Sequence, residues 1–465
     1  MVLKIETINA QYINYIDTTN DRYEITAKYL KTNSGYISCG STFYNSDQPA
    51  YFRNFVVKTY DNNLNITNTS RYGDTVSLYD AFSICKVGNF YYSGGMKSFD
   101  TLTQAVIHKF DSLGNILSEY EILNTYTFTS IVSILSIDDY LFVAGNFKDT
   151  NGDPKAFVVK MDTVMNIIWQ KNFNQGINDF VILLDTCSLN NLVLSTVSLT
   201  NADDSKAFIY KLDTAGNIIW TRNFGDNLIW NGLACKELPN GNYFCYGAKE
   251  NSLKGINDSW FLKLDNFGLL LNDTVISISN ETDYATFGSL VNDGILVTGL
   301  DTENGTELCY LSKFDFDGSF LWKRIYGPRN FGNYLNSHID LQNGFHLLTG
   351  FVYFDSTINT NDEWFLIVDE FGCDVSNCNL SLNEIDKNDY FSIYPNPAIQ
   401  NFNIEIPSNI NSRIEIYNSI GELAYSTISS ASNLEINTQN YENGIYLVTI
   451  NSDNFIQTQK ILISK

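Results

Sequence analysis

Carboxylates in the polar segments between β-prone runs are the residues of this chain best suited to chemistry. They are Asp100, Asp149, Asp153, Asp203, Asp204, Asp258, Asp301, Glu303, Asp362 and Glu363. Among them, Asp149-Thr-Asn151-Gly-Asp153 places oxygen ligands at alternate positions, as a short calcium loop does. The later bidentate Glu of such a loop is missing, because Lys160 stands at that spacing. The segment is read either as a calcium site at Asp149, Asn151 and Asp153 or as an ordinary polar turn, and calcium is the one cofactor that the sequence suggests.

Two carboxylates could also serve as acid and base in glycoside cleavage. The sequence does not show which carboxylates converge, so it assigns no catalytic residue. The three histidines, His108, His338 and His346, favour structural roles, because two of them stand inside β-prone runs. The chain has no Gly-x-Ser-x-Gly elbow, no Walker loop and no His-Glu-x-x-His pair.

The eight cysteines suggest two local pairs. Cys373 and Cys378 enclose a short polar loop and are predicted to form a disulfide. Cys235 and Cys245 flank the turn Leu-Pro-Asn-Gly, so they would face each other across a hairpin. Buried free thiols are expected for the other four, and the absence of a Cys-x-x-Cys pair gives a zinc site no support.

These residues must be positioned by a repeating β-rich framework. One pattern recurs at spacings of 50 to 54 residues: a β-prone run, an Asp, a short turn that usually contains Gly, and a second β-prone run. The Asp residues of the seven copies are Asp61, Asp111, Asp162, Asp213, Asp265, Asp315 and Asp369. Asp at the first position and Gly at the fourth suit a type I turn. A second hairpin precedes each of these, and it ends at a small residue: Gly40, Gly95, Gly145, Ser195, Gly247, Gly299 or Gly350. Four antiparallel strands per repeat of about 51 residues indicate a propeller blade.

The sequence therefore predicts an all-β chain in which residues 1–379 form a seven-bladed β-propeller. The last repeat lacks room for a fourth strand, and the β-prone segment around Val2 to Ile16 is expected to supply it and close the ring. Lys stands two residues before Asp in five repeats, where a surface ion pair is expected. Trp stands seven residues after Asp in three repeats and is expected to cover the outer blade surface.

The tail is a separate module. A polar linker, residues 380–389, precedes short alternating strands in residues 390–465, which read as a small Ig-like β-sandwich. Four short segments follow one another in order: Tyr394-Pro395-Asn396-Pro397, Ile416–Leu423 with Gly421, Gly444–Ile450, and the closing Lys460–Lys465. In these pieces the tail resembles the type A C-terminal sorting domain of the Bacteroidota type IX secretion system. An ordinary Ig-like domain is the alternative.

That resemblance implies export across the outer membrane, with the secretion machinery and a sortase-like peptidase as partners. It also implies release from the cell or attachment to its surface. The start of the chain lacks the charged and apolar stretches of a signal peptide, which favours a truncated N-terminus or a misassigned start. No apolar run is long enough for a membrane span.

The net charge of −23 argues against nucleic acid, since phosphate binding needs a basic face. The leading hypothesis is a secreted or cell-surface propeller that binds an extracellular glycan or protein without catalysis. One alternative is a carbohydrate-active hydrolase or lyase that uses carboxylates on the propeller face. A second alternative is a structural component of the cell surface.

Overall fold

The computed structural model describes most of the chain. The described residues are 14–17, 24–43, 53–123, 125–201, 204–228, 232–251, 256–276, 281–303, 305–327, 332–342, 344–355, 360–374, 391–405, 412–418, 423–452 and 456–465. The chain divides into two compact units, Met1–Asn379 and Leu380–Lys465. In these ranges the regular elements are β-strands, apart from one three-residue 3-10 turn at Ser188–Asn190. No helix among the described residues is long and apolar enough to cross a membrane.

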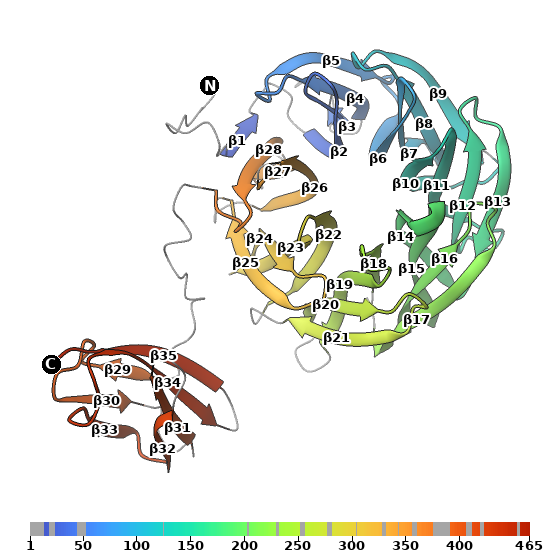
Figure 1. Ribbon diagram of the computed structural model, residues 1–465. Helices are drawn as coiled ribbons and strands as arrows, with labels where there is room; N and C mark the ends of the chain where they lie inside the picture. The colour runs from blue at the N-terminus through green and yellow to red at the C-terminus, as the bar shows by residue number, and fades with distance from the viewer. Residues whose placement is uncertain are drawn as a thin grey trace. The chain divides into compact units, whose positions relative to one another are not determined.

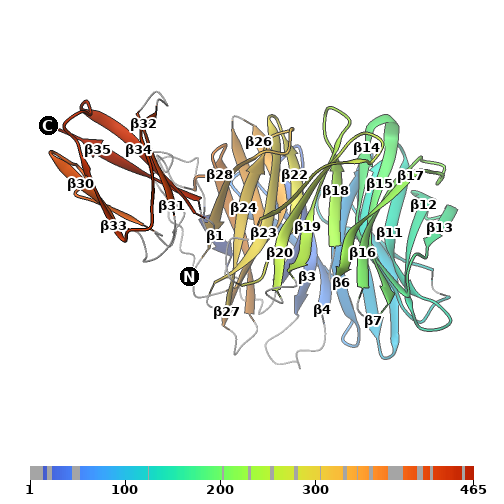
Figure 2. The ribbon, with the colours of Figure 1, turned by 90° about the horizontal axis from the view of Figure 1, so that it is seen from below.

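The first unit is a ring of antiparallel β-sheets, each built from strands that follow one another along the chain (Figure 1; Figure 2 gives the view from below). The first eight strands are β2 (Glu24–Lys31), β3 (Tyr36–Phe43), β4 (Arg53–Tyr60), β5 (Ile66–Tyr72), β6 (Leu78–Val87), β7 (Phe90–Phe99), β8 (Leu102–Phe110) and β9 (Ile116–Ile122). They are two sets of four, joined into one eight-stranded sheet by a single parallel pair, Arg53 with Leu78.

The next sheets have four strands each. The third set is β10 (Thr129–Ile137), β11 (Tyr140–Lys148), β12 (Pro154–Asp162) and β13 (Ile167–Phe173). The fourth is β14 (Asn178–Cys187), β15 (Asn191–Asn201), β16 (Asp204–Leu212) and β17 (Ile218–Leu228). The fifth is β18 (Gly232–Glu237), β19 (Tyr243–Asn251), β20 (Ile256–Leu264) and β21 (Leu270–Ile276). The sixth is β22 (Asp283–Val291), β23 (Gly294–Glu303), β24 (Thr306–Phe314) and β25 (Phe320–Tyr326). We call β2, β6, β10, β14, β18, β22 and β26 the inner strands, since each is the strand of its set nearest the centre of the ring (Figure 1).

The last set closes the ring with a strand from the N-terminal end of the chain. It contains β26 (Asn333–Gln342), β27 (Phe345–Asp355), β28 (Thr360–Asp369) and β1 (Asn14–Asp17). β1 pairs antiparallel with β28, with Asn14 opposite Leu366 and Asp17 opposite Glu363. The expected fourth strand of the last repeat is therefore present at Asn14–Asp17, while Val2 and its neighbours lie outside the described residues.

The Asp-anchored turns have the geometry that their sequence predicts. In all seven, the carboxylate Oδ1 accepts hydrogen bonds of 2.7–3.0 Å from the backbone N–H groups two and four residues later. The Gly of five turns has a φ of 73–85°, and Leu64 and Met165 occupy the same left-handed region at 62° and 71°. This conformation is accessible to Gly without a steric penalty, which explains its recurrence.

The repeated Trp residues contact neighbouring sheets. A Cβ atom added at Gly216, Gly268 and Gly372 would lie 3.2, 3.0 and 2.7 Å from Trp169, Trp220 and Trp322 of the preceding sheet, in that order. The Trp residues thus support the next turn and do not simply cover the outer surface.

The expected ion pairs between each Lys and the Asp two residues later are wrong. The Lys109 and Lys160 ammonium groups lie 4.3 and 4.1 Å from the Phe90 and Tyr140 ring centres. The other three reach carboxylates elsewhere, at 2.8–3.3 Å: Lys211 with Glu237, Lys263 with Asp317 and Lys313 with Asp293. The reason is that each Asp carboxylate accepts hydrogen bonds from the backbone of its own turn, while the long Lys side chain reaches a partner on a neighbouring strand or sheet.

In six of the seven repeats, the small residue at the end of the first hairpin faces a bulge in the inner strand; Gly247 faces β18, whose described pairing has no register shift. The pairing register shifts by one residue in β2, β6, β10, β14, β22 and β26, opposite Gly40, Gly95, Gly145, Ser195, Gly299 and Gly350. A Cβ atom added at Gly95, Gly145 or Gly350 would lie only 1.8–1.9 Å from a backbone carbonyl oxygen of that strand. Gly is favoured at these positions because the backbone of the inner strand comes too close for a side chain.

Gly145→Ala is expected to lower the free energy of unfolding by roughly 2–3 kcal/mol, because its Cβ would meet the Ser130 carbonyl oxygen at 1.9 Å. Gly232→Ala is the matched control, since its Cβ would meet only the Ile182 side chain at an ordinary 3.7 Å. Urea unfolding of both variants measures the difference. An equal loss in both would show that the close approach of the neighbouring backbone does not set the requirement for Gly.

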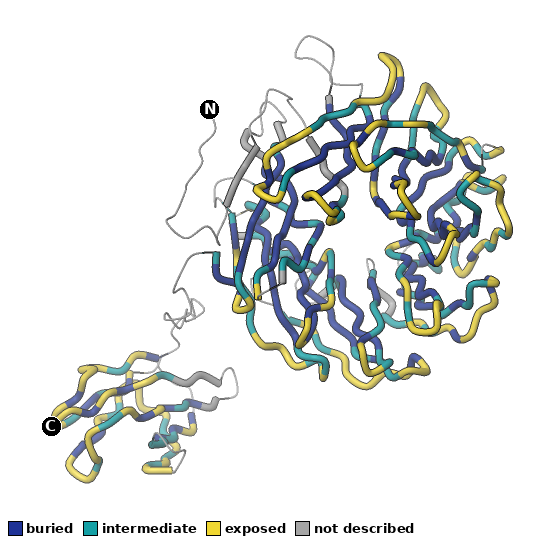
Figure 3. Tube along the Cα trace, turned by 45° about the horizontal axis from the view of Figure 1, so that its top comes forward, coloured by how far each residue is buried: buried dark blue, intermediate teal, exposed yellow. Residues whose placement is uncertain are grey.

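Buried residues fill the space between consecutive sheets, and the turns are exposed (Figure 3). One such core joins the first sheet to the last: Tyr29, Tyr36, Tyr60, Leu64, Ile339, Leu347, Phe365 and Ile367. Burial between neighbours explains why a single sheet would not be stable alone.

The second unit has two sheets over its own core. One sheet contains β29 (Ser392–Tyr394), β30 (Asn401–Glu405) and β33 (Asn433–Asn437). The other contains β32 (Leu423–Ser429), β31 (Ser412–Asn418), β34 (Gly444–Ser452) and β35 (Ile456–Ile463). Their shared core contains the buried hydrophobic residues that the structure describes between Phe391 and Ile463.

Candidate functional site

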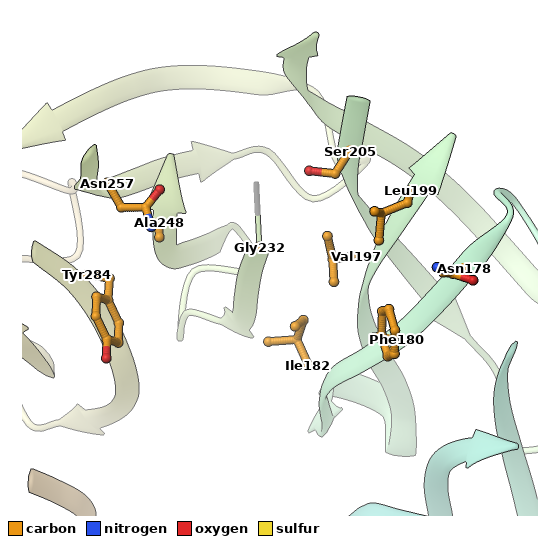
Figure 4. A pocket seen from close by; sticks show the side chains of 10 residues that line it. All are labelled: Asn178, Phe180, Ile182, Val197, Leu199, Ser205, Gly232, Ala248, Asn257 and Tyr284. Atoms are coloured by element: carbon orange, nitrogen blue, oxygen red, sulfur yellow. The ribbon is translucent and has the colours of Figure 1, made fainter. Parts of the chain in front are cut away.

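An apolar pocket of about 590 Å³ lies among the fourth, fifth and sixth strand sets. Its lining residues are Asn178, Phe180, Ile182, Val197, Leu199, Ser205, Gly232, Ala248, Asn257 and Tyr284. In Figure 4, Tyr284 lies on one side of the pocket and Phe180 and Ile182 lie on the other. Ile182 is the extra residue of the bulge in β14, between Val181 and Leu183, and 36% of its surface is exposed. The bulge therefore helps to shape the pocket wall.

The pocket lining is suited to binding. None of the ten lining residues is Asp, Glu, Lys, Arg, His or Cys. Asn178, Ser205, Asn257 and the Tyr284 hydroxyl supply polar groups beside apolar walls. A ligand site commonly combines this volume with a few polar groups that orient the ligand. The lining provides no pair of carboxylates for glycoside cleavage.

A charged pair lies further along two of the same strands. Asp185 follows Ile182 by three residues on β14, and Lys236 follows Gly232 by four residues on β18. The Lys236 ammonium contacts Asp185 Oδ2, and both side chains are partly exposed. Burial opposes the charge on Lys236, but the Asp185 carboxylate outweighs it and raises the Lys236 pKa.

His338 on inner strand β26 lies between two polar partners. Its Nδ1 is 2.7 Å from Ser289 Oγ, and its Nε2 is 3.1 Å from His346 Nδ1. Burial, followed by the neighbouring His346, lowers the pKa of His338 to about 3. His338 is therefore neutral near pH 7 and is a weak base.

The buried His338 makes stability depend on pH. Its folded pKa lies below the ordinary value of 6.5, so protonation below pH 6.5 favours the unfolded chain. The parent chain is expected to lose on the order of 2 kcal/mol of stability from this residue between pH 6.5 and pH 5. His338→Gln should remove that part of the loss, as urea unfolding at both pH values would measure. An equal loss in parent and variant would contradict the assignment.

The carboxylates expected in a ring of loops are placed differently. Asp258, Asp301 and Glu363 stand within strands and are 1%, 4% and 0% exposed. Asp100 is exposed, Asp204 begins β16, and Asp203 lies outside the described residues. A continuous solvated acidic rim does not form from these residues, because three of them are buried within strands β20, β23 and β28.

Glu363 and Lys58 form a buried ion pair between the last sheet and the first. Lys58 Nζ lies 2.9 Å from Glu363 Oε2, with 3% and 0% of the two side chains exposed. The Tyr29 hydroxyl donates to Glu363 Oε1 at 2.7 Å, and the Tyr60 hydroxyl lies 3.0 and 3.1 Å from the two carboxylate oxygens. The Glu363 carboxylate is thus satisfied by protein groups and holds the ring together.

The candidate calcium segment adopts the same turn as the repeats. Asp149 Oδ1 accepts hydrogen bonds from the backbone of Asn151 at 2.8 Å and of Asp153 at 3.0 Å. Gly152 has a φ of 87°, as in the other turns. Among the described residues, no group of three or more His, Cys, Asp or Glu side chains is arranged to hold a metal ion. Calcium at Asp149, Asn151 and Asp153 remains a prediction.

Cys235 and Cys245 lie opposite each other in β18 and β19 and form a disulfide, as the hairpin position suggests. Cys373 is also disulfide-bonded, and Cys378 lies outside the described residues. Cys39, Cys85 and Cys309 are free and buried, and Cys187 is free and half-buried. Burial raises the pKa of the Cys39 thiol to about 11, which keeps it protonated near neutral pH.

The predicted sorting residues come together in the second unit. Asn396 donates to the Lys460 carbonyl at 2.9 Å and accepts from the Leu462 N–H at 2.9 Å, so the Tyr394–Pro397 segment is joined to β35. The Tyr394–Pro395 and Asn396–Pro397 peptide bonds are both cis. Gly444 begins β34, and the Lys465 ammonium donates to the Gln439 carbonyl at 2.9 Å. Gly421 lies outside the described residues.

The pocket and the Asp185–Lys236 pair were not expected from the sequence. One signal could have indicated the pocket: in six of the seven repeats, the small residue that ends the first hairpin lies opposite a bulge in the inner strand. The residues set out of register by these bulges include Phe82, Val132, Ile182, Thr286 and Asn336. These residues differ between repeats, whereas the Gly opposite them recurs.

A curated relative and several solved structures are distantly similar to the chain. Ulvan lyase NLR42 of Nonlabens ulvanivorans is 21% identical over 202 residues, which cover 41% of this chain and 34% of that enzyme. The match thus spans about a third of the length of that relative.

The solved structures include PorZ, a surface component of the type IX secretion system of Porphyromonas gingivalis. It is 12% identical, with a TM-score of 0.43 over 97% of this chain and 60% of that chain. The β-propeller domain of the Trilobed protease from Pyrococcus furiosus is 11% identical, with a TM-score of 0.44 over 76% of this chain and 97% of that domain. These similarities are too distant to carry properties of either protein to this chain.

The tail gives a specific match. The family model described as "Secretion system C-terminal sorting domain" matches residues 392–464. The matched residues include the Asn396 contacts with β35 and the two-sheet core described above. The chain thus carries a type IX C-terminal sorting domain at residues 392–464, behind a large propeller-like β-rich region, and is sorted to the cell surface or the extracellular space.

Proposed function

We propose that the β-rich unit is a seven-bladed propeller, residues 1–379, that binds an extracellular ligand without catalysis. A linker, residues 380–389, joins it to an Ig-like sorting domain, residues 390–465. The type IX machinery and a sortase-like peptidase handle that domain during export. The seven strand sets, counting the eight-stranded sheet as two, support the blade number.

The observation that carries the binding function is the apolar pocket at Ile182, Phe180 and Tyr284. Its volume of about 590 Å³ suits one or two sugar rings or a side chain of a protein ligand. Aromatic and aliphatic walls stabilise such ligands by contact, while Asn178 and Asn257 offer hydrogen bonds that select orientation. Acid–base chemistry would need titratable groups, which the ten lining residues lack apart from the Tyr284 hydroxyl.

Ile182→Trp tests this function by filling the pocket. The probe is a panel of immobilised neutral and acidic polysaccharides, and retention of the chain on each is measured. Ile182→Trp should weaken retention at least about tenfold, since a ring placed in the pocket excludes the ligand. Ile219→Trp is the control, because Ile219 is 51% exposed on the outer strand β17. Equal retention of both variants would contradict a binding role for the pocket.

A second candidate function is a polysaccharide lyase or hydrolase. The sequence similarity to an ulvan lyase favours it, although the similarity covers 41% of this chain. The titratable groups nearest the pocket along the inner strands are Asp185 and Lys236, so these residues would be the first to examine for catalysis.

A further inference from the structure

The inner strand β18 lacks the bulge that fixes the register of the other inner strands. In β2, β6, β10, β14, β22 and β26 a bulge lies opposite the small residue that ends the first hairpin, and bulges hold two strands in one register. The described pairing of β18 with β19 has no such shift, although Gly247 stands at the same place, opposite Leu233. β18 also has 6 residues, against 8 to 10 in the other inner strands.

The side-chain pattern of β18 does not specify its register either. Leu233 and Cys235 pack in the core toward the fourth strand set, and Ala234 packs in the core toward the sixth. Because both faces of the strand meet apolar cores, a slip by one residue would still place apolar side chains on both sides. The Asp185–Lys236 contact opposes such a slip, but both side chains are partly exposed, so solvent screens their attraction.

The Cys235–Cys245 disulfide is the covalent restraint on this register. The two residues lie directly opposite each other in β18 and β19, two pairs beyond the pair of Leu233 with Gly247. A slip by one residue would turn the two side chains to opposite faces of the sheet, where no disulfide can join them. Both cysteines are fully buried, so a reductant does not reach the bond in the folded chain.

The same hairpin forms part of the apolar pocket. Gly232 and Ala248 are paired with each other, and both line the pocket. A Cβ atom added at Gly232 would lie 3.7 Å from the side chain of Ile182, another lining residue (Figure 4). A slip of β18 that placed Leu233 opposite Ala248 would therefore bring a Leu side chain to this position and fill the pocket.

We propose that the pocket binds its ligand only after the Cys235–Cys245 disulfide has formed, an inference that rests on the proposed binding function. In the reducing cytoplasm the two thiols stay free, and the register of β18 is not fixed. In an oxidising compartment they pass two electrons and two protons to the disulfide of an oxidant, which leaves as two thiols, and the Sγ–Sγ bond forms. The chain is sorted to the cell surface or the extracellular space, so ligand binding begins only after the chain has left the cytoplasm.

Retention of a double variant, Cys235→Ala with Cys245→Ala, tests this coupling. The probe is the panel of immobilised polysaccharides that tests the pocket. The double variant should be retained at least about tenfold more weakly than the parent. Cys85→Ala is the matched control and should be retained like the parent, because Cys85 is a buried free cysteine on the bulged inner strand β6. Equal retention of the double variant and the parent would overturn the proposal.

Chemical reduction tests the same step without a substitution. Dithiothreitol alone should leave retention of the folded parent unchanged, because both cysteines are buried. Unfolding in urea with dithiothreitol and refolding under reductant should weaken retention at least about tenfold, and glutathione disulfide should restore it. Cys373 is also disulfide-bonded, so the double variant is carried through the same cycle to measure the share of Cys373. Full retention of a parent refolded under reductant would contradict the coupling.

Amide hydrogen exchange reports on β18 without any ligand and separates this proposal from the binding function. The peptide that contains Gly232–Glu237 should exchange at least about tenfold faster in the double variant than in the parent, while β14 and β22 exchange as in the parent. If no polysaccharide retains the parent, the binding function fails, while faster exchange in β18 still supports the role of the disulfide in its register. Unchanged exchange in β18 would overturn that role.

Discussion

A chain that lacks residues 390–465 is expected to keep its folded β-rich unit and to remain inside the producing cell. The deleted segment contains the whole sorting domain match, residues 392–464. It also contains every residue of the core of the second unit, which runs from Phe391 to Ile463. The cores between the sheets of the first unit use residues outside this segment, so they should persist.

The measurement is the fraction of the protein on the cell surface and in the medium of a bacterium with a type IX system. The truncated chain should be missing from both fractions, while the full chain reaches them. Gly232→Ala serves as a folded full-length control, because its Cβ meets only ordinary contacts. Normal surface delivery of the truncated chain would contradict a sorting role for the tail.

Glu363→Ala is expected to lower the free energy of unfolding by about 3–5 kcal/mol. The substitution leaves the buried Lys58 ammonium without its carboxylate, and it removes the acceptor of the Tyr29 and Tyr60 hydroxyls. Because the Lys58–Glu363 pair joins the first sheet to the last, the substitution is expected to weaken the contact that closes the ring. Urea unfolding followed by fluorescence measures it.

Two companion variants make this result specific. Asp317→Asn removes the partner of Lys263, but Asp317 is 86% exposed, so the change should be below about 1 kcal/mol. The double variant Lys58→Met with Glu363→Leu should recover much of the loss, because an apolar pair leaves no buried charge. A single Glu363→Ala variant as stable as Asp317→Asn would show that the buried pair does not hold the ring.

The repeat period predicted the framework because each copy carries its own local instructions. Asp at the turn start and a residue at positive φ three positions later determine a hairpin wherever they occur. The same reasoning predicted that the segment around Val2 to Ile16 completes the last repeat, and β1 at Asn14–Asp17 overlaps the end of that segment. The sorting residues were also visible, because Asn396 and the closing strand form a compact motif.

The site could not be predicted in the same way. Lys58 and Glu363 are 305 residues apart in the sequence, so no local pattern specifies their contact. The carboxylates of Asp258 and Asp301 looked like loop residues because strand length was underestimated at β20 and β23. The pocket is lined by residues that vary between repeats, so the repeat pattern that predicts the fold does not predict the pocket.

Product analysis after incubation with polysaccharides tests the central claim, that the β-rich unit binds without catalysis, most directly. Neutral and acidic polysaccharides that the chain retains would be incubated with it and then sized by chromatography, with Ile182→Trp in parallel. The account predicts that the polymers are retained by the parent, released by the variant and recovered at their original size. Shorter saccharides that appear with the parent and not with a heat-unfolded sample would contradict it.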